Sequence, residues 1–418
     1  MKKTATLFLA LLAALAAGAQ SIKVIGSNAD NYMLLSVSPN GQYAAGINSA
    51  TNNSILWNIN SGEVLETSGQ ESVNCVNNQG VMVGYQGEYP VKILPDLTVE
   101  QLLTDTMGMA NAISDDGLIC GATMDESYTT HACVWKDGKT IMLPEPTSEE
   151  AGTEVNGTSA KFVSGDGKVI AGYVQDNMST WPLIIWRLQP DGSYKVIPTC
   201  KAYYNDGNDA TNQNPYYNFQ ATSISHNGKW IGLQVTTAGE EGFPTAARIA
   251  RYDIDADTIQ VATLESIDGN EENTECLASG ISDDGTLLGI YNWAFMYGRK
   301  GLLWQPGKAK AELLTNLFKE IEELSVYDKS SHTPVAITPD DGMIVGFGMN
   351  ADYTFEGYCL TTKASTGIHT SSNAVATGST TYYDISGRRL PSLQGVHGLV
   401  IERNVKAGSV ALSKRIIK

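Results

Sequence analysis

The sequence of 418 residues lacks the features of several common protein classes. Charged residues make up only 17% of it, below the usual quarter, which excludes a coiled coil and argues against a long disordered chain. Its 41 glycines do not follow the every-third-residue period of collagen. Beyond the N-terminal segment no apolar run is long enough for a membrane-spanning helix. What remains is a glycine-rich globular chain, whose composition suits short strands joined by tight turns.

Basic residues are also scarce, because 28 Lys and Arg stand against 45 Asp and Glu, for a formal net charge of −17. A chain of this charge repels nucleic acid backbones and anionic lipids, so we expect no nucleic-acid partner. Local motifs of common enzymes are missing as well: the sequence contains no H-E-x-x-H, no G-x-S-x-G and no C-x-x-C. We therefore predict no catalytic residues and no metal site from local patterns.

The first nineteen residues have the pattern of a secretory signal peptide. Lys2 and Lys3 are followed by an apolar core, which ends in the small residues Ala-Gly-Ala. This arrangement predicts a signal peptide over residues 1–19 and cleavage between Ala19 and Gln20. We expect an exported protein that does not span the membrane.

Cysteine is rare, with six residues in the chain. Export makes these cysteines candidates for disulfides, and Cys120 with Cys133 is the first pairing to consider. Four of the six lie in apolar, strand-like segments, where a small buried thiol is the simpler interpretation.

One motif recurs seven times along the chain. It consists of an apolar strand, a turn of the form Ser/Thr/Asn-x-Asp/Asn-Gly, and a second strand that ends in glycine. The turn predicts a two-residue hairpin whose glycine has a positive φ. The second glycine predicts close backbone packing or a bulge in an inner strand. The seven copies begin at Val37, Val76, Ile113, Val163, Ile224, Ile281 and Ile337.

Four copies continue into a third strand that is centred on a tryptophan. Such regularly placed tryptophans are predicted to pack between sheets rather than to bind a ligand. They are Trp57, Trp135, Trp186 and Trp304.

The turn glycines lie roughly 40 to 60 residues apart, which is the length of a four-stranded unit. Such a unit cannot bury both faces of its sheet alone, so neighbouring units pack face to face until the ring closes. The last copy supplies only three strands, and residues 21–26 alternate like the missing one. We predict an all-β, seven-bladed β-propeller over residues 20–362, closed by the N-terminal strand and monomeric. Six or eight blades are the alternatives.

The pattern of the third copy resembles a known repeat. Ala110 to Gly121 and Ala132 to Pro144 resemble the HAF repeats of secreted bacterial propellers. They are also similar to the SPDG repeats of periplasmic TolB-like propellers. The resemblance covers roughly residues 32–362 and implies the architecture rather than the activity, because propellers serve binding, scaffolding and catalysis alike.

The composition changes after Thr362. Residues 363–380 are rich in Ser, Thr and Ala and predict a linker, and residues 381–418 read as a small β unit. This unit resembles the C-terminal sorting domain of the type IX secretion system of Bacteroidetes. The resemblance implies export to the cell surface through the type IX machinery. The matching residues include Asp384, Gly387, Arg388, Arg389 and the terminal Lys418.

The longest loops are predicted on one face of the ring, which carries the connections from second to third strand and from fourth strand to the next blade. Residues 201–219 form the most informative loop, where tyrosines stand among Asn and Asp side chains. Flat rings beside amides and carboxylates suit stacking on sugars, although the same tyrosines can simply pin the loop to the ring. The candidate ligand-binding residues are Tyr203, Tyr204, Tyr216, Tyr217, Trp181 and Trp293.

The sequence thus predicts an exported, non-catalytic propeller that binds a glycan or a protein through this face. The alternatives are a polysaccharide-active hydrolase, whose carboxylates would come from different blades, and a TolB-like periplasmic scaffold. No cofactor is expected. A calcium ion is the one alternative, although the order of the candidate acids differs from that of an EF-hand. Those acids are Asp268, Glu271, Glu272 and Glu275.

Overall fold

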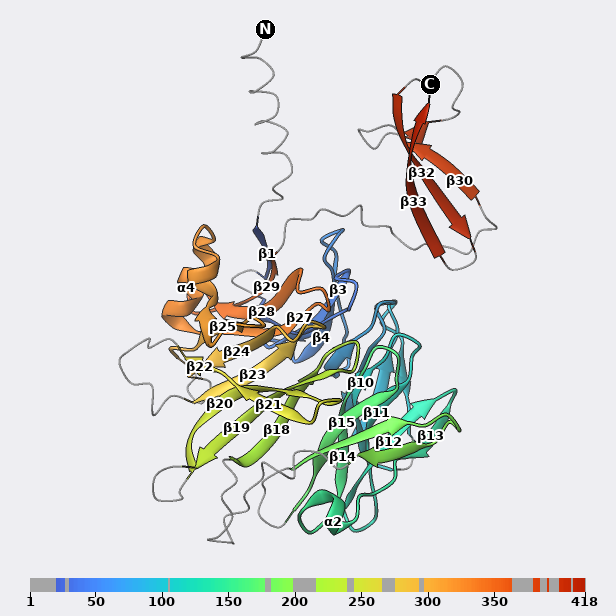
Figure 1. Cartoon of the computed structure of the whole chain (residues 1–418), viewed down its shortest axis with the longest axis vertical. Helices are drawn as coiled ribbons and strands as arrows, with labels where there is room; N and C mark the ends of the chain where they lie inside the picture. Colours follow the sequence, from blue (N-terminus) through green and yellow to red (C-terminus); the bar gives the residue numbers. More distant parts are fainter. Residues whose placement is uncertain are drawn as a thin grey trace. The chain divides into compact units, whose positions relative to one another are not determined.

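The chain divides into two compact units, residues 1–365 and residues 366–418. A computed structural model shows the larger unit as a ring of sheets, coloured from blue to orange in Figure 1. The residues that the structure describes are 20–26, 30–103, 106–176, 182–197, 216–238, 244–264, 275–292, 297–362, 379–383, 389–390, 398–406 and 409–417.

Seven sheets form the larger unit, each a blade with strands a to d in order from the channel outward. Blade 1 consists of β2 (Tyr32–Val37), β3 (Tyr43–Asn48), β4 (Asn53–Asn58) and β5 (Val64–Glu66). Blade 2 consists of β6 (Ser72–Val76), β7 (Met82–Gln86), β8 (Tyr89–Ile93) and β9 (Val99–Gln101). Blade 3 consists of β10 (Gly108–Ile113), β11 (Ile119–Met124), β12 (Thr130–Lys136) and β13 (Lys139–Met142).

The remaining blades repeat this order with two additions, a parallel edge strand on blade 6 and the N-terminal strand on blade 7. Blade 4 consists of β14 (Thr158–Val163), β15 (Val169–Val174), β16 (Leu183–Leu188) and β17 (Tyr194–Ile197). Blade 5 consists of β18 (Tyr216–Ile224), β19 (Trp230–Ala238), β20 (Pro244–Asp253) and β21 (Thr258–Val261). Blade 6 consists of β23 (Cys276–Ile281), β24 (Leu287–Tyr291), β25 (Lys300–Trp304) and β26 (Lys310–Leu313), with β22 (Thr263–Leu264) beside β26. Blade 7 consists of β27 (His332–Ile337), β28 (Met343–Met349), β29 (Phe355–Thr361) and β1 (Ser21–Ile25).

The prediction of seven blades closed by the N-terminal strand is confirmed. β1 pairs antiparallel with β29, from Ser21 opposite Thr361 to Ile25 opposite Gly357, and the two lie side by side in Figure 1. A strand from the start of the domain therefore completes the sheet formed by its end, which ties the ring shut without a covalent link.

The a–b turns differ from the predicted two-residue hairpins. In blade 3 the amide of Gly117 donates to the carbonyl of Ser114 at 3.2 Å, and the amide of Ser114 donates to the carbonyl of Leu118 at 2.9 Å. Gly117 has a positive φ of 84°, whereas Asp116 does not. This is a three-residue loop with the left-handed residue at its end. The buried serine selects it, because Ser114 Oγ accepts from the amide of Leu118 at 3.0 Å and donates to the Asp116 carboxylate at 2.6 Å.

Blade 7 departs from the predicted turn in a second way. The left-handed residue is Asp341, with a φ of 52°, and the following Gly342 does not have a positive φ. The prediction that the glycine of the turn has a positive φ is therefore wrong for blade 7. Asp is among the residues that tolerate this conformation, so the turn survives without glycine there.

Replacing Gly117 by valine is expected to lower the free energy of unfolding by roughly 1 to 3 kcal/mol. No heavy atom lies within 4 Å of a Cβ placed on Gly117, so the loss comes from the positive φ and not from a clash. Urea unfolding of the variant and the parent protein measures it. If the urea concentration at the midpoint of unfolding did not change, the turn would have another conformation.

The second glycine of each repeat faces a bulge, as predicted. In blade 4 the register shifts between Ala160 and Phe162, and Gly172 pairs with Ala160. A Cβ on Gly172 would overlap the carbonyl oxygen of Ser159. Equivalent shifts occur in all seven inner strands, and the residues they leave out of register are Leu35, Asn74, Asn111, Lys161, Thr222, Ser279 and Val335.

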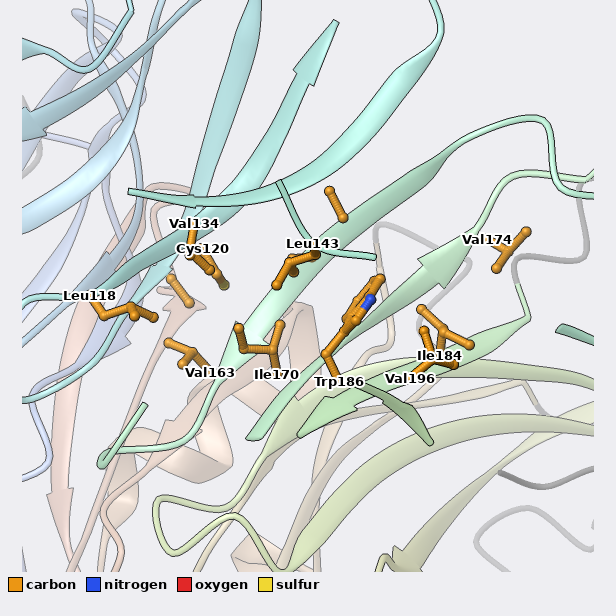
Figure 2. Close-up of a cluster of buried hydrophobic side chains, with 13 residues drawn as sticks. Leu118, Cys120, Val134, Leu143, Val163, Ile170, Val174, Ile184, Trp186 and Val196 are labelled. Atoms are coloured by element: carbon orange, nitrogen blue, oxygen red, sulfur yellow. The ribbon is translucent and has the colours of Figure 1, made fainter. Parts of the chain in front are cut away.

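Apolar clusters hold neighbouring blades together. Figure 2 shows the cluster between blades 3 and 4, where Trp186 lies among Leu143, Ile170 and Ile184. The Nε1 of Trp186 donates to the carbonyl of Pro144 at 2.8 Å. All four predicted core tryptophans are buried, which confirms their packing role: Trp57, Trp135, Trp186 and Trp304.

The first-choice disulfide is wrong. Cys120 lies opposite Val134 and Cys133 lies opposite Gly121, so the two cysteines are offset in adjacent strands. Cys120 belongs to the cluster between blades 3 and 4, whereas Cys133 belongs to the one between blades 2 and 3. Their side chains therefore leave the sheet on opposite faces, and burial raises the pKa of both thiols, that of Cys133 to about 12.

In the described part of the larger unit, three short helices lie in d–a connections. α2 (Ser148–Ala151) precedes blade 4, and α3 (Leu314–Leu317) and α4 (Glu322–Ser330) precede blade 7. The buried residues of α3 and α4, Leu314, Leu324 and Tyr327, pack into the cluster of blades 6 and 7. Among the described residues no helix is long and apolar enough to cross a membrane.

The smaller unit is a single antiparallel sheet, as the sequence predicts. Its strands are β30 (Ser379–Tyr383), β31 (Arg389–Leu390), β32 (Gly398–Lys406) and β33 (Ser409–Ile417), in the order β31-β30-β32-β33. Of the residues that match the sorting-domain pattern, Arg389 begins β31. Asp384, Gly387, Arg388 and Lys418 lie outside the described residues.

Candidate functional site

The residues predicted to bind a ligand are only partly covered by the structure. Tyr216 and Tyr217 begin β18, the inner strand of blade 5, and Tyr216 pairs with Thr237. Tyr203, Tyr204, Trp181 and Trp293 lie outside the described residues. The binding role of all six residues stays a prediction.

The candidate calcium acids are covered even less. Glu275 is exposed at the start of blade 6, whereas Asp268, Glu271 and Glu272 lie outside the described residues. Within the described part of the chain, no three His, Cys, Asp or Glu side chains are grouped so that they could hold a metal ion.

The predicted binding face does carry exposed aromatic side chains that sequence reasoning missed. Tyr128 lies in the b–c loop of blade 3 and Tyr353 in the b–c loop of blade 7, and they are 72% and 74% exposed. A third, Tyr297, is 60% exposed and lies in the b–c connection of blade 6. By blade topology, b–c and d–a loops share one end of the ring, which we call the loop face.

Tyr128 and Tyr353 sit on two copies of the same turn. Both have a left-handed backbone, with φ of 62° and 61°, and their amides donate to the carbonyls of Asp125 and Asn350, respectively, at 3.0 and 3.1 Å. A bulky residue in this region costs about 1 kcal/mol or more and persists only where the surroundings enforce it. The two loops share the sequence Asp/Asn-x-x-Tyr-Thr, and this pattern could have predicted the common turn.

The side chains of Asp125 and Asn350 enforce these turns. Asp125 Oδ1 accepts from the amides of Ser127 at 2.8 Å and Thr129 at 2.9 Å. Asn350 Oδ1 accepts likewise from the amides of residues 352 and 354, at 3.0 and 3.1 Å. Each tyrosine is thus held outward by a rigid loop rather than by packing of its ring.

Polar groups accompany both tyrosines. In blade 3, His131 Nδ1 lies 2.6 Å from Glu145 Oε1 and its Nε2 lies 3.2 Å from Asp125 Oδ2. The hydrogen bond to Glu145 raises the pKa of His131 most, and the hydrogen bond to Asp125 raises it further. In blade 7, Glu356 accepts from Asn350 Nδ2 at 2.8 Å and from the Tyr327 hydroxyl at 3.0 Å. Each exposed ring therefore has carboxylate oxygens beside its loop.

The a–b turns form the opposite end of the ring, where hydrogen bonds link neighbouring blades. The amide of Asp115 donates to the carbonyl of Gly165 at 3.0 Å, and the amide of Gly165 donates to the carbonyl of His226 at 2.7 Å. The His226 ring reaches past blade 4, and its Nε2 lies 2.9 Å from Asp115 Oδ2 in blade 3. A Cβ on Gly165 would overlap the imidazole, so the glycine makes room for the contact between His226 and Asp115.

A cavity of about 130 Å³ lies at this end of the central channel. Each blade contributes to its wall, and Asp115 and His226 stand among its lining residues. Its aliphatic wall, which we call the collar, consists of the last residue of each inner strand: Val37, Val76, Ile113, Val163, Ile224, Ile281 and Ile337.

One further polar cluster is structural. His332 is fully buried, with Nδ1 at 2.7 Å from Asp328 Oδ1 and Nε2 at 2.9 Å from the Tyr358 hydroxyl. Burial raises the pKa of Tyr358 well above its ordinary value. The arrangement looks like a charge relay, but both His332 and Tyr358 are closed off from solvent. It fastens α4 to blade 7.

Comparisons with known proteins identify the fold but not a family or a function. No protein-family model matches the chain, and no curated protein does. An oligogalacturonate lyase from Vibrio parahaemolyticus is 9% identical, with a TM-score of 0.51 over 82% of this chain and 97% of the lyase. TolB from Acinetobacter baumannii is 12% identical, with a TM-score of 0.37 over 82% of this chain and 80% of TolB. At 9% identity the similarity to the lyase shows the β-propeller fold alone.

Proposed function

We propose that this protein is an exported, non-catalytic β-propeller that binds a glycan through its loop face. The observation that carries the proposal is the pair of exposed rings, Tyr128 and Tyr353, held in strained conformations on matching loops. Strain of this kind has no benefit for a ring that contacts solvent only. It pre-organises an aromatic surface for a ligand, because the entropy of ordering the loop is already lost before binding.

Glycans fit this surface because their faces combine C–H groups with hydroxyls. An aromatic ring covers the apolar face of a sugar, and nearby carboxylates accept hydrogen bonds from its hydroxyls. Both kinds of group are present: Tyr128 shares its loop with Asp125, and Tyr353 shares its loop with Asn350, which donates to Glu356. The sequence predicts the tyrosine loop, Trp181 and Trp293 on the same face, although Trp181, Trp293 and most of that loop lie outside the described residues.

The inner strands offer no pair of carboxylates for hydrolysis inside the channel. A glycosidase needs two carboxyl groups about 5 to 10 Å apart beside the scissile bond. The seven inner strands, β2, β6, β10, β14, β18, β23 and β27, contain no Asp or Glu. Their wall at the turn end is the aliphatic collar, which offers no acid pair for catalysis.

The double variant Tyr128→Ala/Tyr353→Ala is expected to bind its polysaccharide at least about tenfold more weakly, since each stacked ring contributes roughly 1 kcal/mol or more. Affinity electrophoresis through gels that each contain one purified polysaccharide identifies the ligand and measures the loss. Met142→Ala, which removes an exposed side chain from the outer strand of blade 3, is the matched control. Retention of every polysaccharide by the double variant would refute the proposal, and failure of the parent to bind any would point to a protein ligand.

We also propose that the C-terminal unit directs the protein to the cell surface through type IX secretion. The proposal is supported by the sequence resemblance over residues 381–418 and by the division of the chain into two compact units. A unit that is compact by itself can fold without the rest of the chain.

Deleting residues 381–418 is expected to leave the thermal unfolding of the propeller in place and to retain the protein in the periplasm of a host with type IX secretion. Cell fractionation and calorimetry of the full-length and truncated chains measure the two results. A truncated chain that still reaches the surface would contradict the sorting role. Loss of the cooperative transition would show instead that the tail is part of the propeller.

A further inference from the structure

The cavity at the turn end of the channel combines an apolar wall with one carboxylate. Beyond the collar, its lining residues are Pro39, Cys75, Asp115, Gly165, His226 and Pro339. Asp115 is the one acid among the residues that line the cavity, and none of them is a lysine or an arginine. A charged ligand in this cavity is therefore favoured if it is a cation and disfavoured if it is an anion.

The second residue of each a–b turn stands at the mouth of this cavity, and we call these residues the rim. In blades 3, 4 and 5 they are Asp115, Gly165 and His226. Blades 7 and 1 contribute Pro339 and Pro39. In a ring of seven consecutive blades, blade 4 lies opposite the junction of blades 7 and 1. The rim is therefore polar on one side and apolar on the other.

Two donors orient the Asp115 carboxylate and leave part of its acceptor capacity unused. Its Oδ1 accepts from Asn78 Nδ2 at 3.0 Å, and its Oδ2 accepts from His226 Nε2 at 2.9 Å. A neutral imidazole provides this second donor, and the carboxylate then keeps its full charge. A carboxylate has about four acceptor positions, so about two remain. Because the Asp115 side chain is 39% exposed, a ligand at the mouth of the cavity can reach it.

Away from the rim, the wall of the cavity has no comparable polar side chain. It consists of the collar, whose seven side chains are all branched and aliphatic, and of Cys75, whose thiol forms only weak hydrogen bonds. A buried water molecule needs about two to four polar partners, and these side chains do not provide them. This part of the cavity therefore favours an apolar occupant over water.

The size of the cavity limits the length of such an occupant. Its volume of about 130 Å³ is near that of an apolar cavity known to hold benzene. A hydrocarbon chain of about six carbon atoms has a similar size and would bury its surface against the collar. The rim adds a single carboxylate at one side of the opening, where the end of such a chain would lie.

We infer that the cavity binds a primary alkylammonium ion, whose charged group donates to Asp115 and whose hydrocarbon chain lies against the collar. An ammonium group has three N–H donors. Asp115 accepts from one or two of them, and water at the exposed rim accepts from the rest. This site lies at the turn end of the ring, so it is independent of the glycan binding proposed for the loop face.

Titration calorimetry with hexylammonium chloride, at neutral pH and constant ionic strength, tests the inference. The parent protein is expected to bind hexylammonium and to bind propylammonium more weakly, by roughly fourfold for each methylene lost. Hexanoate should bind at least about tenfold more weakly than hexylammonium, because its charged group would be repelled by Asp115. Equal binding of propylammonium, or of hexanoate, would overturn the inference.

A matched pair of variants tests the role of the carboxylate. Asp115→Asn is expected to lower the affinity for hexylammonium at least about tenfold, because the amide lacks the charge. Asp283→Asn is the control, because Asp283 occupies the same position of the turn in blade 6 but does not line the cavity. Its affinity should stay within about twofold of that of the parent, since salt screens a distant charge. Undiminished binding by Asp115→Asn would also overturn the inference.

A second measurement does not depend on a variant. In protein with ¹³C-labelled isoleucine methyl groups, the methylene protons of bound hexylammonium should show nuclear Overhauser effects to the isoleucines of the collar. These are Ile113, Ile224, Ile281 and Ile337. Effects confined to other isoleucines would place the ligand outside the cavity and contradict the inference.

Discussion

Replacing Gly172 by alanine is expected to lower the free energy of unfolding by roughly 2 to 4 kcal/mol, one of the largest effects of a single substitution in this protein. The added Cβ would overlap the carbonyl oxygen of Ser159 and lie 3.0 Å from the Cα of Ala160. Both are backbone atoms of the bulged inner strand, so no side-chain rotation relieves the clash. The inner strand would have to move away from its neighbour and open the channel wall.

Urea unfolding followed by tryptophan fluorescence measures this loss. Gly192→Ala is the control within the same blade, because Gly192 has a φ of 85° but nothing within 4 Å of its added Cβ. That variant carries only the cost of the positive φ, about 1 kcal/mol. Equal destabilisation of the two variants would show that the close approach of β14 and β15 is not what requires glycine at position 172.

Replacing Trp186 by alanine is expected to cost roughly 3 to 5 kcal/mol. The ring is fully buried between blades 3 and 4, where Leu143 and Ile184 surround it in Figure 2. The blades are held together by such clusters rather than by covalent links, so a cavity here weakens the contact between two whole sheets.

Phenylalanine substitutions separate the packing of the ring from its hydrogen bond. Trp186→Phe leaves the Pro144 carbonyl without its 2.8 Å donor, at a cost of about 1 kcal/mol beyond the packing change. Trp135→Phe removes an Nε1 that has no hydrogen-bond partner among the residues that the structure describes, and it should therefore cost less. Thermal unfolding of both variants checks the order, and a reversed order would contradict the assigned hydrogen bond.

Several elements followed from the sequence because their causes are local. The seven repeats predicted seven blades, since each copy contains the strand and turn residues that form its own hairpin. The second glycine predicted a bulge, and Gly172 lies opposite one. The apolar surroundings of Trp186 predicted burial, and the alternating residues before the first repeat predicted the closing strand β1.

Other features depended on contacts that local sequence does not specify. The turn type was missed because the Ser114 side chain, and not the Asp-Gly pair alone, closes the loop. The pairing of Cys120 with Cys133 failed because their register places them on opposite sheet faces, and only strand pairing fixes which face a residue takes.

The candidate sites depend most strongly on the tertiary structure. The turns of Tyr128 and Tyr353 are local, but their exposure on one face follows from the arrangement of blades 3 and 7. His226 reaches Asp115 across 111 residues of sequence, and the collar collects one residue from each blade. The sequence by itself determined the blade, because a blade is built from neighbours along the chain. Only the closed ring decided what surrounds its channel, because those residues come from seven distant repeats that meet when the first strand pairs with the last.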